Sequence, residues 1–270
     1  GSAGPGRGPD PQFPLPGVIA GVSHCDRAGG GILVTRAAHQ AGPLCDLIRI
    51  HHGRALRFPA IEITGPKDPE LAGKLLGAVE DFDIVVFISP NAVSRSVRLL
   101  PVGGIPPAVK IAAVGRGTGN CLAEADISVD LIPEGRFDSE ALLGSPALHA
   151  PAGKRILIVR GEGGRALLGD TLAERGAMVT YAEVYQRRCP TGDASQLLQT
   201  WDRDVDLVTA TSREILENLF HMVGPEGAGQ LRRTPLVVIS ERMHGIAGEL
   251  GCRKISMARR ADDLAVFEAI

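Results

Sequence analysis

The sequence lacks the features that mark several common classes of protein. Its five cysteines are spread over 270 residues without a C-x-x-C pair, which argues against a disulfide framework or a zinc site and favours cytosolic thiols. Basic residues number 29 and acidic residues 31, so there is no electrostatic reason to expect nucleic-acid or membrane binding. No apolar run approaches the roughly 20 residues that a membrane span needs. We therefore expect a cytoplasmic, globular protein.

Common catalytic and nucleotide-binding motifs are also missing. There is no G-K-[ST] of a P-loop, and Gly115-Arg-Gly-Thr-Gly119 lacks the third glycine of a dinucleotide fingerprint and lies in mid-chain. No catalytic triad, metal cluster or carboxylate dyad stands out, so we expect neither a metal nor another cofactor. Residues 1–30 are rich in glycine and proline without periodicity, which predicts a disordered tail, and Gly1-Ser2 resembles an expression scar.

From residue 31 onward, short apolar runs alternate with helical patterns. Strands are expected at 32–35, 56–63, 83–88, 110–114, 128–132, 154–159, 178–185, 206–211, 236–239 and 254–257. Helices are expected at 39–52, 69–79, 115–125, 138–149, 166–175, 194–203 and 262–270, with others starting after Ser89, Ser212 and Ser240. This alternation predicts parallel sheets covered by helices on both faces, and about ten strands are too many for one sheet.

A weak internal repeat supports two similar lobes. Residues 83–93 resemble residues 206–216, and in each segment a strand runs into a serine, Ser89 or Ser212, that is suited to cap the next helix. Pro90 fits the first position of the helix after Ser89. The economical interpretation is two α/β lobes whose strand ends face a shared cleft.

A glycine-rich turn, Arg160-Gly-Glu-Gly-Gly-Arg165, lies between an expected strand and an expected helix. Backbone N–H groups at a helix start lack partners and attract anions, and an arginine fork matches a carboxylate or a phosphate. The turn would lie at the carboxyl end of a parallel strand, where open α/β sheets bind ligands. The pattern predicts a small-anion site; the alternative is a tight turn with surface arginines.

Taken in order, several short segments resemble the uroporphyrinogen-III synthase family, which makes tetrapyrroles without a cofactor. The matching segments are 34–36, 58–63, 83–93, 113–118, 160–165, 183–187 and the helix start at Ser212. The resemblance implies two α/β lobes joined by a two-stranded linker near 58–64 and 183–190. The first lobe would be discontinuous, with residues 31–61 and 189–270, and the second would span 62–188.

The resemblance also implies a reaction. The family's substrate is hydroxymethylbilane, a linear tetrapyrrole with eight carboxylates, which loses its hydroxyl as water and closes to uroporphyrinogen III with the last ring inverted. The family works largely by positioning, which agrees with the missing catalytic motifs, and a monomer is expected. The remaining alternative is a non-catalytic, two-lobed protein that binds a small anion in the same cleft.

Roles follow residue by residue from the resemblance. Tyr185 matches the tyrosine proposed as the acid that helps the hydroxyl leave, or else it is simply packed at the linker. Tyr181 is expected on the same face of that strand. The segment 240–243 lacks the threonine that some members carry there. The residues expected to bind substrate, of which the hydroxyl residues could instead be helix caps, are Arg36, Ser89, Thr118, Arg160, Gly161, Gly164, Arg165, Ser212 and Ser240.

Overall fold

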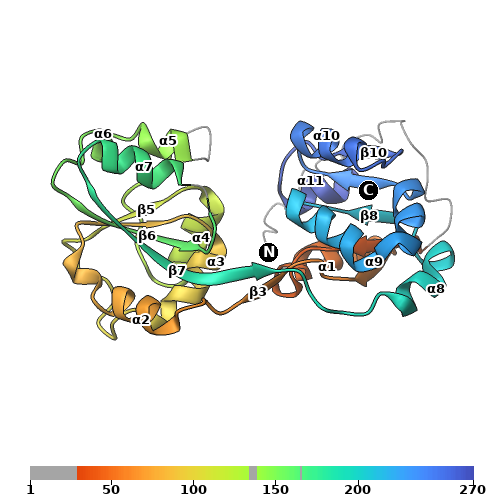
Figure 1. Ribbon diagram of the computed structural model, residues 1–270, viewed down its shortest axis with the longest axis horizontal. Coiled ribbons are helices and arrows are strands. Elements are labelled where there is room, and N and C mark those ends of the chain that lie inside the picture. The colour runs from red at the N-terminus through yellow and green to blue at the C-terminus, as the bar shows by residue number, and fades with distance from the viewer. Residues whose placement is uncertain (1–28, 134–138, 165) are drawn as a thin grey trace, which may run out of the picture.

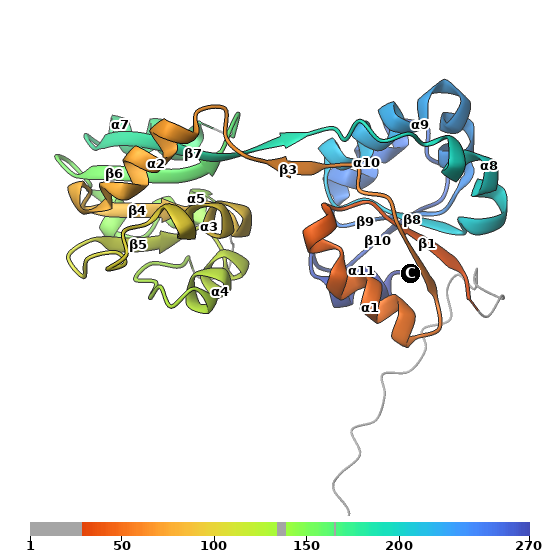
Figure 2. The same ribbon diagram turned by 90° about the horizontal axis from the view of Figure 1, so that it is seen from below.

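The computed structural model describes residues 29–133, 139–164 and 166–270. Its strands form two five-stranded sheets that are flanked by helices (Figure 1). The resulting lobes lie side by side and are joined by extended chain, as the view from below shows (Figure 2). The predicted α/β fold of two similar parallel-sheet lobes is confirmed. The expected tail lies, up to residue 28, outside the described residues, and none of the described helices is long and apolar enough to span a membrane.

The first lobe is built on a fully parallel sheet in the order β10-β9-β8-β1-β2. Its strands are β1 (Gly31–Val34), β2 (Arg54–Arg57), β8 (Leu207–Thr209), β9 (Leu236–Val238) and β10 (Ile255–Met257). Its helices are η1 (Ala38–Gln40), α1 (Gly42–Ile50), α8 (Ser195–Asp204), α9 (Arg213–Arg233), α10 (Glu241–Glu249) and α11 (Asp263–Glu268). All four residues of β1 are buried, as expected for a strand that lies inside the sheet between β8 and β2.

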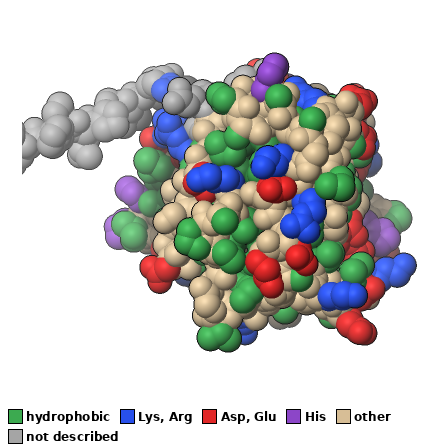
Figure 3. Space-filling model, turned by 90° about the vertical axis from the view of Figure 1, so that its left-hand side faces the viewer, with side chains coloured by type: hydrophobic (Ala, Val, Ile, Leu, Met, Phe, Trp, Pro, Cys, Tyr) green, Lys and Arg blue, Asp and Glu red, His purple; other side chains and the backbone are tan. Residues whose placement is uncertain are grey.

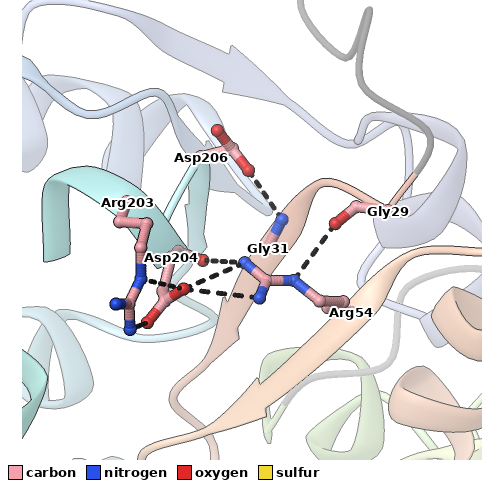
Figure 4. Close-up of polar contacts among 6 residues, drawn as sticks. All are labelled: Gly29, Gly31, Arg54, Arg203, Asp204 and Asp206. Carbon is pink, nitrogen blue, oxygen red and sulfur yellow. Dashed lines mark hydrogen bonds and ion pairs between the residues drawn. The ribbon is translucent and has the colours of Figure 1, made fainter. Parts of the chain in front are cut away.

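Charged residues tie the amino end of β1 to the segment before β8 (Figure 4). The N–H of Gly31 donates to the Asp206 carboxylate at 2.7 Å, and Arg54 Nη2 donates to the Asp204 carbonyl at 3.2 Å. The hydrogen bond from Arg203 holds the pKa of the Asp204 carboxyl far below its ordinary range. A Cβ added at Gly31 would lie 1.7 Å from the Asp204 carbonyl oxygen, so this close approach requires glycine.

The second lobe contains the sheet β3-β7-β6-β4-β5, in which β4 to β7 are parallel and β3 is antiparallel to β7. Its strands are β3 (Glu62–Thr64), β4 (Ile84–Phe87), β5 (Lys110–Ala113), β6 (Arg155–Gly161) and β7 (Met178–Arg188). Its helices are α2 (Pro69–Gly77), η2 (Val79–Asp81), α3 (Pro90–Ser96), η3 (Val97–Leu99), α4 (Arg116–Glu124), α5 (Ser139–Leu143), α6 (Pro146–His149) and α7 (Leu167–Glu174).

The antiparallel β3–β7 ladder forms the connection between the lobes. β7 is long enough to pair with β6 first and then, with its last three residues, with β3. Asn218 of α9 donates to the carbonyl of Ala60 at 2.8 Å, which fixes the ladder to the first lobe. Arg95 of α3 donates to the carbonyl of Ile63 at 2.5 Å, which fixes it to the second. Side chains of both lobes therefore hold the connection.

Four expected elements differ from the structure, and the first is the expected helix at 39–52, which is split into η1 and α1. The expected strand at 56–63 is two strands in different sheets, because the chain leaves the first sheet around Pro59, which has no N–H to donate. The expected strand at 128–132 is reduced to a single β-bridge between Ala112 and Leu131. Next to this bridge, the side chain of Asp130 accepts the hydrogen bond of the Ile111 N–H. The expected helix at 138–149 is broken into α5 and α6, with Pro146 starting the second.

The end of the second lobe that points away from the first carries charges of both signs among apolar side chains (Figure 3). Ion pairs occur where strands of this lobe begin. Lys110 lies 2.8 Å from Asp130, and Lys154 lies 3.4 Å from Asp83. The pKa of Asp83 is lowered mainly because its carboxylate accepts the backbone N–H of Arg155. The hydrogen bond from Lys154 lowers this pKa further. Charges at this end of the sheet thus largely offset one another.

Candidate functional site

The turn from β4 into α3 joins a helix cap to the candidate acid. Ser89 precedes α3, and its Oγ accepts the N–H of Ala92 at 3.1 Å, while Pro90 is the first helical residue, as predicted. The same Oγ lies 3.2 Å from the phenol oxygen of Tyr185. Tyr185 is only 2% exposed, whereas Ser89 is half-buried. The structure therefore brings two of the expected site residues, Ser89 and Tyr185, into direct contact.

A β-bulge in β7 determines where Tyr185 points. Arg160 pairs with Glu183 and the next residue of β6, Gly161, pairs with Tyr185, so Val184 is an extra residue in β7. An extra residue reverses the alternation of side chains beyond it. Val184 and Tyr185 accordingly belong to one core cluster, while Tyr181 packs against another. The expectation that Tyr181 and Tyr185 share a strand face is therefore wrong.

Gly161 provides the space that the Tyr185 ring occupies. A Cβ added at Gly161 would lie 2.5 Å from both Cε2 and Cζ of that ring, a separation that real side chains do not reach. A glycine inside a strand commonly marks such a close approach. The N–H of Glu162, the next residue, donates to the carbonyl of Tyr185 at 2.9 Å. The start of the glycine-rich turn thus fixes both the ring and the backbone of Tyr185.

Arg160 turns back onto the glycine-rich turn. Its side chain is buried, and its guanidinium donates to the carbonyls of Gly161 at 3.2 Å and Gly164 at 2.6 Å. It also lies 3.6 Å from the Glu183 carboxylate and 4.7 Å from the centre of the Tyr181 ring. These contacts engage the guanidinium within the second lobe. Arg165, the other arginine of the motif, lies outside the described residues.

Glu162 connects the same turn to the ladder. Its carboxylate accepts a hydrogen bond from Gln186 Nε2 at 2.8 Å and from the N–H of Lys67 at 2.5 Å. The hydrogen bond from Gln186 is the main reason that the pKa of Glu162 lies below its ordinary value, and the hydrogen bond from Lys67 lowers it further. The carboxylate is therefore ionised at neutral pH and joins the turn after β6 to β7 and to the segment between β3 and α2.

Thr118 lies close to the start of α3 but is not a helix cap. It is buried within α4, whose N-cap position is Gly115. A Cβ added at the neighbouring Gly117 would lie 3.8 Å from the ring of Pro90, so the starts of α3 and α4 are adjacent. The alternative of simple capping, which holds for Ser89, is therefore wrong for Thr118.

The first lobe contributes a second group of expected residues. Arg36 follows β1 and forms an ion pair with Asp263 at the start of α11. Ser212 follows β8 and accepts the N–H of Ile215 at 3.1 Å, and Ser240 follows β9 and caps α10 in the same way. All three residues lie beyond the carboxyl ends of parallel strands, the edge at which such sheets bind ligands.

The two serine caps predict a measurable loss of stability. Because each Oγ satisfies an N–H group that the helix cannot, Ser212→Ala and Ser240→Ala should each lower the free energy of unfolding by about 1 kcal/mol. Ser94→Ala is the control, since that hydroxyl donates only to the carbonyls of Pro90 and Asn91 in its own helix, and it should change stability by less than about 0.5 kcal/mol. Urea unfolding of the three variants measures this, and equal stabilities would contradict the capping roles.

Two residues of the first lobe that sequence reasoning missed contact the second lobe. His39 and Gln40 of η1 lie within hydrogen-bond distance of Asn91 in α3. Asn91 lies in the segment 83–93 that carried the family resemblance, which was the only sequence signal for its importance. His39 was expected only as the start of a helix.

A cavity of about 550 Å³ opens beside His39, between η1, the ladder and α9. Its walls include Phe58, Ile63 and Met222.

Comparison with known proteins identifies the family. The family model described as uroporphyrinogen-III synthase HemD matches residues 43–268. The chain belongs to the uroporphyrinogen-III synthase family. Among its relatives, the uroporphyrinogen-III synthase of Escherichia coli K12 is 37% identical over 245 residues, which cover 88% of this chain and 99% of that protein. The enzyme of Synechococcus elongatus is 31% identical over 207 residues, 72% of this chain and 75% of the relative.

Solved structures of the family share the fold. A mutant uroporphyrinogen III synthase from the extremely thermophilic bacterium Thermus thermophilus matches with a TM-score of 0.57 at 17% identity, covering 88% of this chain and 96% of that one. The Helicobacter pylori enzyme matches with a TM-score of 0.57 at 16% identity, covering 88% and 97%. The two-lobed fold that the resemblance implied is thus that of the uroporphyrinogen-III synthase family.

Proposed function

We propose that this chain converts hydroxymethylbilane to uroporphyrinogen III. The observation that carries the proposal is the 37% identity to a uroporphyrinogen-III synthase over 99% of that relative's length. The reaction is a cyclising loss of water, so the chain is a hydro-lyase of porphyrin synthesis. The alternative, a non-catalytic anion-binding protein, is not favoured, because the full-length relatives are synthases.

We place the substrate between the carboxyl edges of the two sheets. The contact of His39 with Asn91 supports this placement, because η1 follows β1 and α3 follows β4, so the edges meet there. Helices α4, α9 and α10 begin at these edges and direct N–H groups toward an anionic substrate. Arg36 and Arg160 are engaged in contacts of their own, so backbone groups supply much of the grip.

Tyr185 is proposed to supply the proton for the departing hydroxyl. Its phenol is buried and touches the more exposed Ser89, so we assign Ser89 as the relay: Ser89 protonates the hydroxyl while Tyr185 protonates Ser89. The carbon–oxygen bond breaks and water leaves. Inversion of the last ring then requires that one carbon–carbon bond to that ring breaks and that two new ones form, which closes the macrocycle. The proton that the last ring loses from its free α-carbon restores the phenol.

A coupled assay tests the proposed activity. Hydroxymethylbilane is made in place by the enzyme that supplies it, because it closes spontaneously to the type I isomer, and the two isomers are separated chromatographically. The expected result is predominantly type III product in the presence of the chain. Type I product alone, from a folded protein, would overturn the proposal.

Binding of the product should weaken as salt is added. The substrate and product carry eight carboxylates, and the proposed site attracts them mainly with the positive ends of helices, because Arg36 is already paired with Asp263. Salt shortens the Debye length from about 8 Å at physiological strength to about 3 Å at 1 M, so these attractions are screened. Titration of uroporphyrinogen III at rising salt measures the effect. An affinity that stays constant over this range would argue against electrostatic recognition.

We further propose that the protein works in the cytoplasm as a monomer and without nucleic acid. The proposed site draws on both lobes of one chain, and the four described cysteines are free thiols, which suits a reducing compartment. The lobes are proposed to be 31–61 with 189–270, and 62–188. Light scattering tests the monomer, and proteolysis that cuts first near the ladder would support these boundaries.

A further inference from the structure

Three side chains make a direct polar contact between the lobes, apart from the β3–β7 ladder. Asn91 Oδ1 lies 2.9 Å from His39 Nε2 and accepts a hydrogen bond from Gln40 Nε2 at 3.1 Å. His39 and Gln40 belong to η1 of the first lobe, and Asn91 belongs to α3 of the second. The partners are 51 and 52 residues apart in the chain. These three residues are called the interlobe clasp below.

Both sides of the interlobe clasp are held by local hydrogen bonds. On the first lobe, the N–H of Gln40 donates to the carbonyl of Ala37 at 2.9 Å. On the second, the Ser89 cap fixes the start of α3, from which Asn91 projects. Because Ser89 also touches Tyr185, only one residue separates the clasp from the pair proposed to carry the proton. A change in the spacing of the lobes at Asn91 is therefore a change at the reaction site.

The chemistry of the interlobe clasp suits a contact that opens and re-forms. One amide oxygen accepts from two donors, and neither bond needs a charged partner. His39 donates from Nε2 both as the Nε2–H tautomer and as the protonated ring, so the contact survives either state. His39 and Asn91 are partly exposed, so water replaces the lost partners when the contact opens.

We infer that the interlobe clasp positions the two lobes for catalysis, an inference that rests on the proposed function. It sets the distance between the carboxyl edges, so that helix starts of both lobes grip one tetrapyrrole at once. Such preorganisation improves binding without supplying any reacting group. His39, Gln40 and Asn91 are thus positioning residues, and their loss should raise KM much more than it lowers kcat.

Three variants separate this role from a general weakening of α3. Asn91→Ala and the double variant His39→Ala/Gln40→Ala each remove the contact from one side, and the triple variant removes it from both. Each should raise KM roughly 5- to 10-fold, the equivalent of one or two exposed hydrogen bonds, with kcat within about twofold of wild type. The triple variant should be no worse than Asn91→Ala, because all three break the same contact.

Small-angle X-ray scattering provides the readout that does not depend on activity. The clasp variants should show a larger radius of gyration than wild type. Ser94→Ala removes hydrogen bonds to the backbone carbonyls of Pro90 and Asn91 but leaves the Asn91 amide in place, so it should match wild type in both scattering and KM. Unchanged scattering and KM in Asn91→Ala would overturn the clasp, as would additive effects in the triple variant. A wild-type protein that makes no type III product would instead overturn the proposed function.

Discussion

Replacing Gly161 with alanine is expected to remove most of the activity. The added Cβ would lie 2.5 Å from two carbons of the Tyr185 ring, so the ring or the bulged strand must move. Overpacking of this kind costs about 1–3 kcal/mol of stability, and a displacement of about 1 Å at a reacting group costs about 10²-fold in rate. Thermal unfolding and type III product formation measure the two effects separately.

Two further variants make the Gly161 prediction specific. Gly73→Ala in α2 meets no atom within 4 Å, so it should leave the rate unchanged and slightly raise stability. In a Tyr185→Leu background, which has no ring at that position, Gly161→Ala should cost less stability than it does in wild type. An equal cost in both backgrounds, or full activity of Gly161→Ala, would show that the glycine is not needed to seat the tyrosine.

Tyr185→Phe should fold normally and lose rate by about 10²-fold, the low end of the 10²–10⁴-fold range for general-acid catalysis, because the pyrrole nitrogen also helps expel the hydroxyl. The ring still fills the space above Gly161, so stability should change little apart from the lost contact with Ser89. The measurement is type III product formation, corrected for spontaneous closure to type I, together with product affinity.

Tyr181→Phe is the matched control for Tyr185→Phe. It removes a hydroxyl from the same strand, but Tyr181 precedes the bulge, so its ring lies on the other face, beneath the Arg160 guanidinium and against Gly169. Its rate should stay near that of wild type. If Tyr185→Phe were fully active, the tyrosine would have no part in proton transfer and positioning alone would account for the reaction.

Local patterns predicted much of this fold because they depend on neighbouring residues. Apolar runs marked the strands, and the Ser89-Pro90 pair marked the start of α3 with the correct cap. The same approach failed where a residue's place depends on distant chain. Side chains alternate between the two faces of a strand only while its pairing is unbroken, so counting from Tyr181 gave the wrong face for Tyr185. The bulge at Val184 can be recognised only from the pairing of β7 with Gly161 on the neighbouring strand.

Side-chain direction was the other limit of the sequence. An arginine beside a glycine-rich turn has the same chemistry whether it faces a ligand or the turn, and Arg160 folds back onto the carbonyls of Gly161 and Gly164. The contact between His39 and Asn91 was equally hidden, because it depends on how two separately folded sheets are set against each other. The internal repeat predicted the two lobes and the family resemblance added the two-stranded connection, but neither carried information on these contacts.

The pairing of β1 with β8 has a consequence for how the protein is made. On the ribosome, the buried strand β1 of the first lobe emerges early, but its partner β8 and the Asp206 carboxylate that accepts the Gly31 N–H come 175 residues later. The strands β4 to β7, by contrast, lie close together in the chain and are complete once residue 188 has left the exit tunnel. Synthesis therefore finishes the second lobe first, and during that interval β1 and α1 have β2 as a partner but lack β8, so part of their apolar surface stays uncovered and open to aggregation.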